Sequence, residues 1–224
     1  MDIYDYLKNN NYPGRGLIVG KYNEKMVVAY FIMGRSENSR NRIFKKDGDR
    51  VYTKAYDESK VKDPSLIIYN AFRKINDMSI VTNGNQTDTI YDFLESGRTF
   101  KEALETRDYE PDEPNYTPRI SAIVYDENNY EISILKNNNG KCERLYYNFE
   151  ARSNIGHFIS TYDCDGNPLP AFSKEPLEID IDCNIEEFSD KLWNSLNIDN
   201  KISLYVRYFD NKDTKDIILN KNGD

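Results

Sequence analysis

The segment GLIVGKYNEKMVVAYFIM, residues 16–33, decides the class of fold. Residues 16–20 and 26–33 are rich in β-branched and aromatic side chains, and the polar residues 21–25 separate them. Because such side chains favour the pleated surface of a sheet, the pattern predicts two strands joined by a turn. Neither strand contains a charged residue, so we expect both to be buried.

Further pairs of strands are predicted along the chain. Residues 63–75 and 78–84 form one predicted hairpin, closed by the two-residue turn Asn76–Asp77. Other hairpins are predicted over residues 120–135 and 201–219. In all, about ten strands are expected, most of them in hairpins, which favours antiparallel sheets.

Three helices are predicted between these strands. Their expected N-terminal signals are a cap at Thr87 or Asp88, a capping-box spacing from Thr99 to Glu102, and a cap at Asp182 or Asn184. Because their apolar residues recur on one face, the helices should pack on the outer faces of the sheets. The sequence therefore predicts an α+β fold.

Composition limits the domain organisation and the classes of partner. With 224 residues the chain is long enough for a substantial core, so we expect a single domain over residues 1–224, with a polar lead at 1–12 and a flexible tail at 220–224. The net charge of -8 would repel a nucleic-acid backbone, so no nucleic-acid partner is expected. No signal peptide or long apolar run is visible, which predicts a cytoplasmic protein without a membrane partner.

The cysteine and histidine content argues against a metal centre. Three widely spaced cysteines fit neither a disulfide framework nor a thiolate metal site, and they favour a reducing compartment. The single histidine, His157, lies in a predicted strand and is expected to pack rather than act as a base. We therefore expect no metal and no cofactor.

The acidic segment DYEPDEPNYTPR, residues 108–119, concentrates ionisable groups. Four carboxylates lie within six residues, and Arg119 follows them. Three prolines fix φ and remove amide donors, so the segment should be a stiff loop. Two interpretations stay open from the residues alone: a solvated acidic turn, or a loop that holds a catalytic acid in place.

Two other segments are candidates for binding. Residues 34–42 place Arg35, Arg40 and Arg42 among serines and asparagines after a buried strand, a composition that suits an anion site as well as a solvated loop. In the hairpin that begins at residue 63, Tyr69 and Asn70 interrupt an apolar run. Buried polar side chains need partners, so these two either satisfy backbone groups or face a cavity.

Together, four separated segments resemble one family, the archaeal-type inosine monophosphate (IMP) cyclohydrolases, of which this chain would be a bacterial member. The segments are RSENSR at 35–40, DPSLIIYNAFR at 63–73, VTNGNQTDTI at 81–90 and DYEPDEPNYTPRI at 108–120, with ISTY at 159–162 as a weaker fifth. They follow the family's order and spacing over about the first two thirds of the chain.

The resemblance implies a four-layered αββα sandwich like that of the N-terminal nucleophile hydrolases. It also implies closure of 5-formamidoimidazole-4-carboxamide ribotide to IMP with loss of water, the last step of purine synthesis. No Cys, Ser or Thr follows Met1, so N-terminal nucleophile chemistry is not expected. The partner implied is a purine ribonucleotide, and self-association into a homo-oligomer is compatible with the sequence.

The resemblance also implies roles for individual residues. Arg40 and Tyr69 would donate hydrogen bonds to the formyl oxygen or the carboxamide, and Glu110 would move the proton. The residues expected to bind the nucleotide are Arg35, Ser36, Asn70, Asn83, Thr87, Asp88 and Arg119. Archaeal members carry histidine where this chain has Gln86, and glutamine cannot titrate, so no proton-transfer role is expected there.

Two other functions remain as alternatives. A non-catalytic purine-nucleotide-binding protein would keep the pocket without turnover. An amidohydrolase would use the same arginine, tyrosine and glutamate groups on a related formamide or amide, with water as the nucleophile.

Overall fold

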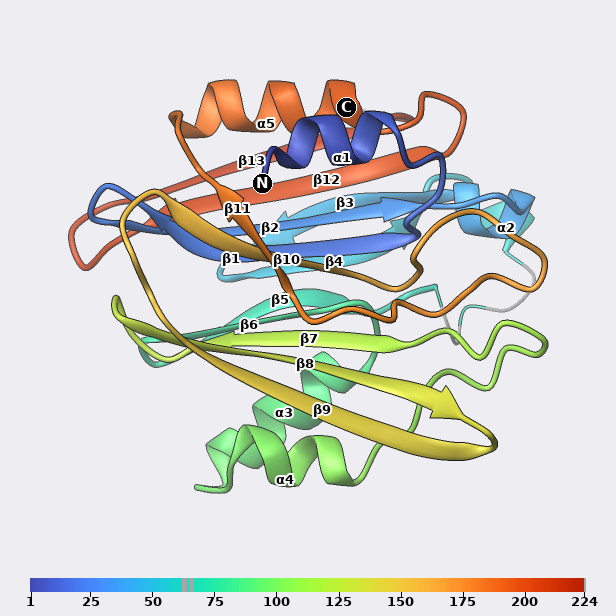
Figure 1. Cartoon of the computed structure of the whole chain (residues 1–224), viewed down its shortest axis with the longest axis horizontal. Helices are drawn as coiled ribbons and strands as arrows, with labels where there is room; N and C mark the ends of the chain where they lie inside the picture. Colours follow the sequence, from blue (N-terminus) through green and yellow to red (C-terminus); the bar gives the residue numbers. More distant parts are fainter. Residues whose placement is uncertain (62–63, 65–66, 224) are drawn as a thin grey trace.

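The computed structural model describes residues 1–61, 64 and 67–223. Within them the chain forms two antiparallel sheets that face each other (Figure 1). Part of the hairpin predicted from residue 63, and Asp224 in the predicted tail, lie outside the described residues.

Each sheet is a continuous series of antiparallel neighbours. The six-stranded sheet has the order β11 (Leu177–Asp180), β10 (Ile155–Ser160), β1 (Arg15–Tyr22), β2 (Lys25–Met33), β12 (Lys201–Phe209) and β13 (Thr214–Asn220). The seven-stranded sheet has the order β3 (Arg42–Asp47), β4 (Arg50–Ala55), β5 (Asn70–Ile75), β6 (Met78–Thr82), β7 (Arg119–Val124), β8 (Asn129–Asn138) and β9 (Lys141–Glu150). The hairpin predicted over residues 16–33 is confirmed, because β1 pairs with β2 and Tyr22 lies opposite Lys25.

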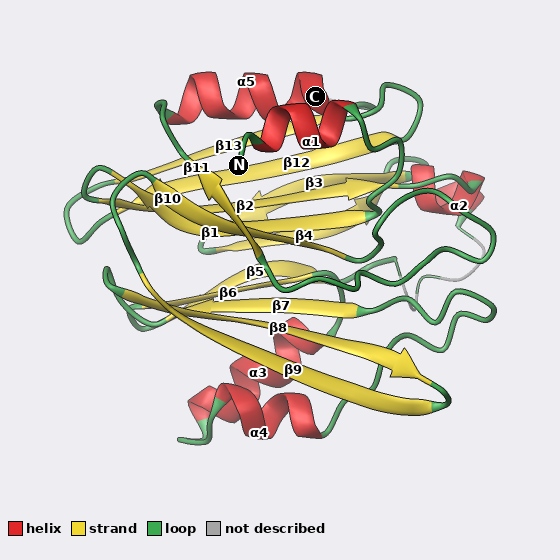
Figure 2. Ribbon diagram, in the orientation of Figure 1, coloured by secondary structure: helices red, strands yellow, loops and turns green. Residues whose placement is uncertain are grey.

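Helices cover the outer faces of both sheets, as Figure 2 shows. The helices α1 (Ile3–Lys8) and α5 (Ile185–Ser195) pack on the six-stranded sheet, and α3 (Gln86–Glu95) and α4 (Phe100–Glu105) pack on the seven-stranded sheet. Two short turns of helix flank the β3–β4 hairpin. The first, α2 (Glu37–Arg40), precedes β3, and the second, η1 (Glu58–Lys60), follows β4. The predicted α+β class with antiparallel sheets is confirmed.

The central core lies between the two sheets. Because side chains alternate across a strand, every second residue of an inner strand points into this core. Tyr30 and Tyr205 of the six-stranded sheet meet Phe72 and Ile132 of the seven-stranded sheet there, all of them buried. The intervening residues pack against the helices and form two outer cores.

Local signals predicted some helix ends correctly and others wrongly. Thr99 and Glu102 form the expected capping box, and Asn184 accepts a hydrogen bond from the backbone of Glu187 as an N-cap. The cap expected at Thr87 or Asp88 is wrong, because α3 begins at Gln86 and both side chains bond to residues on neighbouring strands.

The N-terminal residues, expected to be a polar lead, contain a helix. Asp2 caps α1, and Ile3 and Leu7, four residues apart on one face of this helix, are buried against the six-stranded sheet. In the part of the chain that the structure describes, no helix has both the length and the apolar character needed to cross a bilayer.

Strand direction gathers distant residues at one end of the molecule. Neighbouring strands of the seven-stranded sheet alternate in direction, so β3, β5 and β7 all begin at the same end. Arg42 and Arg119 are the first residues of two of these strands, and Tyr69 directly precedes the third. This end of the sheets, beside α2 in Figure 1, contains the candidate site.

Candidate active site

A cavity of about 370 Å³ opens at this end of the molecule. Its lining comes from the start of β1, the segment around α2, the acidic loop 108–119 and the segment that follows β10. The lining residues are Tyr12, Arg15, Arg35, Ser36, Asn38, Ser39, Ile67, Glu110, Asp112, Asn115, Thr117, Tyr162 and Leu169. The cavity is of the size that suits a small-molecule ligand.

Glu110 is the buried carboxylate of this cavity. Its residue is only 1% exposed, and its Oε2 atom lies 3.5 Å from Nη2 of Arg15. No hydrogen-bond partner for Oε1 is found in the described residues. Burial raises the pKa of Glu110 above its usual range, and the guanidinium groups of Arg15 and Arg119 oppose part of that rise. One carboxylate oxygen is therefore oriented by an arginine while the other is free to exchange a proton.

The acidic loop is held in place by its own hydrogen bonds. The backbone N–H of Glu110 donates to the carbonyl of Thr117 at 2.9 Å, and the backbone N–H of Thr117 donates to the Asp112 carboxylate at 2.6 Å. The rings of Tyr109 and Tyr116 meet edge to face, with centroids 5.5 Å apart. These bonds across the loop explain how an acidic segment rich in proline positions one carboxylate.

A pair of phenols and a buried arginine lie near Arg15 without lining the cavity. The hydroxyl groups of Tyr30 and Tyr69 are 2.8 Å apart and buried. Burial raises the pKa of Tyr30 well above its usual value, so this phenol stays protonated at neutral pH. Arg42 is fully buried and lies within electrostatic range of both tyrosines and of Arg15.

Arg42 has unused hydrogen-bonding capacity. Its Nε and Nη2 atoms donate to the carbonyl and the hydroxyl of Ser39, at 2.8 and 2.9 Å. Within the described part of the chain, Nη1 has no hydrogen-bond partner and the guanidinium takes part in no salt bridge. Burial lowers the pKa of Arg42. Because an unpaired buried cation is costly, this arrangement suits a bound group that carries or develops negative charge.

A second set of hydroxyl groups lines the cavity itself. The hydroxyl of Tyr162 is 2.5 Å from Oγ1 of Thr117, and that oxygen also lies 2.5 Å from the Asp112 carboxylate. Burial raises the pKa of Tyr162 to about 12. The three side chains form a short chain of hydrogen bonds that ends at an acceptor, so the hydroxyl of Tyr162 keeps its proton.

Asn83, Gln86 and Arg119 connect the start of α3 to the acidic loop. Asn83 Oδ1 accepts hydrogen bonds from the backbone N–H of Ile120 and from Gln86 Nε2, both at 2.9 Å, and its Nδ2 donates to the carbonyl of Pro118. Arg119 donates to Gln86 Oε1 at 2.7 Å and to the carbonyl of Asp108 at 2.9 Å. Gln86 thus joins Asn83 and Arg119 in one hydrogen-bonded network.

Gly84 lies directly beneath this network. A Cβ atom at this position would lie 2.7 Å from Arg119 Nη1 and 2.7 Å from Gln86 Oε1, and 3.5 Å from the free oxygen of Glu110. The glycine therefore provides space for the arginine and the glutamine rather than an unusual backbone angle.

Several residues expected to bind the nucleotide lie away from the cavity. Asn70 and Arg73 donate to the Asp88 carboxylate at 2.8 Å, on the face of β5 that α3 covers. Since successive strand residues face opposite sides, Tyr69 faces the central core and Asn70 faces the helix. Thr87 shares a hydrogen bond with Thr82, 2.7 Å between hydroxyl oxygens, inside the protein.

Arg40 also points elsewhere. Its Nε donates to the carbonyl of Gly34 at 3.0 Å and its Nη2 to Asn200 Oδ1 at 3.2 Å. It is exposed and does not line the cavity. Of the arginines in the segment 34–42, Arg42 rather than Arg40 lies beside the phenols.

Arg35 and Ser36 lie at the mouth of the cavity. Arg35 donates to the Asp165 carboxylate at 2.6 Å and lies over the ring of Tyr12, 4.9 Å from its centroid. Ser36 caps α2 through the backbone N–H of Ser39. In residues 1–61, 64 and 67–223, no three His, Cys, Asp or Glu side chains gather as a metal site would require.

Comparison with known proteins decides the family. The sequence pattern of the family described as "IMP cyclohydrolase-like protein" matches residues 12–214. This chain belongs to the IMP cyclohydrolase-like family. The matched range begins at Tyr12, which lines the cavity, and includes all the other lining residues.

Relatives of this family member include three archaeal proteins named IMP cyclohydrolase. The protein of Methanopyrus kandleri is 32% identical over 180 residues, which are 75% of this chain and 86% of the relative. That of Methanocaldococcus jannaschii is 30% identical over 185 residues, 79% and 88% of the two chains. That of Methanococcus aeolicus is 30% identical over 158 residues, 68% and 75%.

Sequence reasoning missed several residues of this IMP cyclohydrolase-like cavity. Arg15 and Tyr162, which line it, were not among the predicted site residues, although Tyr162 ends the weak fifth motif. Tyr30, the partner of Tyr69, was not predicted either, and Arg42 was predicted only as part of the candidate anion-binding segment 34–42. A signal was present for Arg15, because it lies between two glycines at the start of a buried strand. A charged residue in such a position needs a partner, and here that partner is Glu110.

Replacing Asn83 by alanine should destabilise this IMP cyclohydrolase-like protein. The change leaves the backbone N–H of Ile120, the carbonyl of Pro118 and the Gln86 amide without their partner, and each unsatisfied buried group costs ~1–3 kcal/mol. We expect a loss of about 2–4 kcal/mol in the free energy of unfolding, measured by urea denaturation.

Asn85→Ala is the matched control, because Asn85 is exposed and its side chain makes no cap hydrogen bond. It should change the free energy of unfolding by less than ~0.5 kcal/mol. Unchanged stability in Asn83→Ala, together with a raised KM, would contradict the structural role.

Proposed function

We propose that this chain is an IMP cyclohydrolase that closes 5-formamidoimidazole-4-carboxamide ribotide to IMP with loss of water. The observation that supports this most is a buried carboxylate with a free oxygen in the cavity, Glu110, within electrostatic range of a buried guanidinium with a free N–H, Arg42. The family match and the names of the archaeal relatives point to the same reaction.

The reaction has simple chemical requirements. The carboxamide nitrogen attacks the formyl carbon and loses a proton, while the formyl oxygen takes up negative charge and then a proton. That oxygen leaves as water when the former formamide nitrogen gives up its own hydrogen and the ring C=N bond forms. A base, a donor for the oxygen and fixed rotamers of both groups are therefore needed.

Glu110 and its neighbours meet the requirement for proton transfer. In its ionised form, the free Oε1 atom accepts the proton from the carboxamide nitrogen and returns a proton to the departing oxygen. Arg15 binds the other oxygen of the carboxylate and so fixes its orientation. Because burial raises the pKa of Glu110, the carboxylate is a stronger base than an exposed glutamate.

Arg42 and Tyr69 meet the requirement for a donor. We assign to Arg42 the role that the family resemblance gave to Arg40, because Arg42 lies beside Tyr69 and Tyr30 and has a free N–H group. Tyr69, whose hydroxyl is fixed by Tyr30, is the second donor. One well-placed donor to a developing oxyanion is worth ~3–4 kcal/mol.

The nucleotide phosphate is assigned to the mouth of the cavity. Arg35 and Ser36 lie there, and Arg35 would exchange Asp165 for the phosphate. We assign Asn83, Thr87 and Arg119 to support of the acidic loop and of α3 instead of substrate contact, and Asn70 and Asp88 to the contact between β5 and α3. No step of this proposal requires a metal ion or a cofactor.

The remaining expectations from the sequence continue as proposals. The helices on the outer faces of two stacked sheets support a four-layered αββα sandwich resembling the N-terminal nucleophile hydrolases, formed by a single domain over residues 1–224. The free cysteines Cys142, Cys164 and Cys183 fit the cytoplasm. A bacterial origin and a homo-oligomer stay predictions.

The proposed activity is tested directly with purified protein and the formamido ribotide. We expect IMP to form at the same rate with and without a chelator. The formation of IMP is measured by chromatography. Formate and the aminoimidazole ribotide in place of IMP would instead identify an amidohydrolase. Tight binding of IMP without turnover, by a protein shown to be folded, would identify a non-catalytic nucleotide-binding protein.

A further inference from the structure

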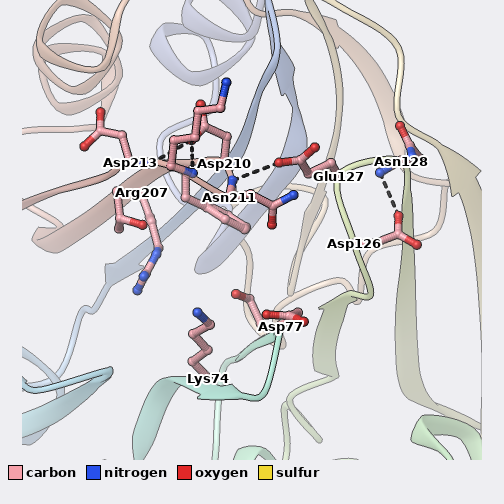
Figure 3. Close-up of a pocket in the computed structure, with 13 residues that line it drawn as sticks. Lys74, Asp77, Asp126, Glu127, Asn128, Arg207, Asp210, Asn211 and Asp213 are labelled. Carbon is pink, nitrogen blue, oxygen red and sulfur yellow. Dashed lines mark hydrogen bonds between the residues drawn. The ribbon is translucent and has the colours of Figure 1, made fainter.

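A second cleft lies between the two sheets at the end opposite the candidate active site (Figure 3). Its volume is about 510 Å³. It lies where the turns between β5 and β6, β7 and β8, and β12 and β13 come together. None of its lining residues belongs to the active-site cavity.

Arg207 of β12 lies deep in this cleft. Along β12, Tyr205 packs in the central core and Val206 and Tyr208 pack against the helix side, so Arg207 faces the seven-stranded sheet. The residue is 4% exposed, and its guanidinium lies 4.9 Å from the ring centroid of Phe72. An arginine in this position is almost completely withdrawn from water.

The charge of Arg207 is only partly compensated. Its closest carboxylates are Asp49 and Asp216, each at 3.8 Å, which is too long for a hydrogen bond. Asp216 already accepts hydrogen bonds from Tyr205 and from Lys46. Among the described residues, Nε and Nη1 of Arg207 have no hydrogen-bond partner. Two N–H groups of a buried cation are thus available to a ligand.

Two more donors line the same cleft. Ser79 of β6 is 1% exposed, and its hydroxyl has no partner in the part of the chain that the structure describes. Its neighbour Ile80 packs on the helix side, so Ser79 faces the cleft. Lys74 of β5 extends into the cleft from the strand that faces Arg207, as Figure 3 shows. Two cations that face a common space repel each other unless an anion lies between them.

Five carboxylates of the described chain line the cleft, and four of them are already engaged, the exception being that of Asp77. Asp126 and Asp210 accept hydrogen bonds from backbone N–H groups of their own turns, and Glu127 accepts one from the backbone N–H of Asn211. Asp213 pairs with Lys25 at 2.6 Å. Their negative charge at the rim nevertheless disfavours a large polyanion. An anion that fits is therefore small.

We propose that this cleft binds a small oxyanion, a carboxylate or inorganic phosphate, through Arg207, Ser79 and Lys74. Nε and Nη1 of Arg207 lie on different edges of the guanidinium, so an oxygen of the anion can accept from either one of them, in a charge-assisted hydrogen bond like those of arginine to carboxylates and phosphates elsewhere. The hydroxyl of Ser79 and the ammonium of Lys74 supply donors to the remaining lone pairs. This site is separate from the proposed catalytic function and does not depend on it.

The proposal is tested by titrating the isotopically labelled full chain with sodium phosphate and, separately, with sodium acetate, with sodium chloride as the ionic-strength control. Backbone amide spectra locate the site, because amides of Asp77, Ser79 and Asn211 report on this cleft while those of Ser36 and Glu110 report on the active site. We expect saturable shifts at the first group with at least one of the two anions. The anion that gives them identifies the ligand class.

Variants make the test specific. Ser79→Ala and Lys74→Gln should each weaken binding at the cleft, and the double variant should weaken it at least tenfold. Neither change should alter the shifts at the active site. Ser133→Ala is the matched control, because Ser133 is equally buried and unpartnered but lies on the helix face of β8. Shifts that are linear in salt, or binding that survives in the double variant, would overturn the proposal.

Discussion

Replacing Arg42 by methionine should lower kcat/KM for ring closure by about 10²–10³-fold while raising stability. The loss of activity follows because Arg42 supplies a donor to the formyl oxygen where negative charge develops. The gain in stability follows because methionine fills a similar volume without burying an unpaired charge. We expect the free energy of unfolding to rise by about 1 kcal/mol. Steady-state kinetics and urea denaturation of the same preparation measure both effects.

Arg40→Met is the control for this experiment. Arg40 belongs to the same short segment, but it is exposed and bonds to Gly34 and Asn200 outside the cavity. We expect its kcat/KM within about threefold of the wild type and its stability within ~0.5 kcal/mol. If Arg40→Met lost the activity and Arg42→Met kept it, the assignment derived from the structure would be wrong and that implied by the family resemblance would be right.

Replacing Glu110 by glutamine should lower kcat by about 10²–10⁴-fold. Glutamine has nearly the same shape and keeps an oxygen beside Arg15, but it cannot accept the proton of the carboxamide nitrogen. Substrate affinity should change little because the cavity keeps its volume. Single-turnover kinetics separate these two quantities. A glutamine variant with unchanged kcat would refute the role of Glu110.

The pH dependence offers a second measurement on the same variant. The ionised carboxylate is the base, so the wild-type rate should rise with pH through the raised pKa of Glu110, and this limb should vanish in the glutamine variant. The free energy of unfolding should change with pH in the opposite direction to the rate. Between the pKa of Glu110 in the unfolded chain and its higher pKa in the folded chain, the folded state binds more protons, so the free energy of unfolding falls as pH rises. That fall should also be absent in the glutamine variant.

Local patterns in the sequence predicted the elements better than they predicted the site. The hairpin over residues 16–33 and the capping box at Thr99 depend on residues close together in the chain, so periodicity and spacing were sufficient. The cap at Thr87 or Asp88 failed because both side chains find partners on neighbouring strands, which local spacing does not reveal.

The site depends on the directions of the strands and on the side of the sheet to which each side chain points. The sequence left open whether the loop around Glu110 is solvated or holds an acid in place, and the structure shows Glu110 buried. Tyr69 was expected to satisfy backbone groups or face a cavity, whereas its hydroxyl meets that of Tyr30. Arg15 and Arg42 meet them only because β1 and β3 begin at the same end of the two sheets. Asn70 was grouped with Tyr69 by sequence, but adjacent strand residues face opposite sides.

The close approach at Gly84 restricts which sequences can accompany this site. A methyl group there would press on both Arg119 and Gln86, and backbone conformation offers no relief because the constraint comes from side chains that converge on the glycine. Position 84 can therefore admit a larger residue only if the ends of the Arg119 and Gln86 side chains move aside, which would disturb the hydrogen bond between them. The three positions are thus energetically coupled, and the effect of replacing one of them should depend on which residues occupy the other two.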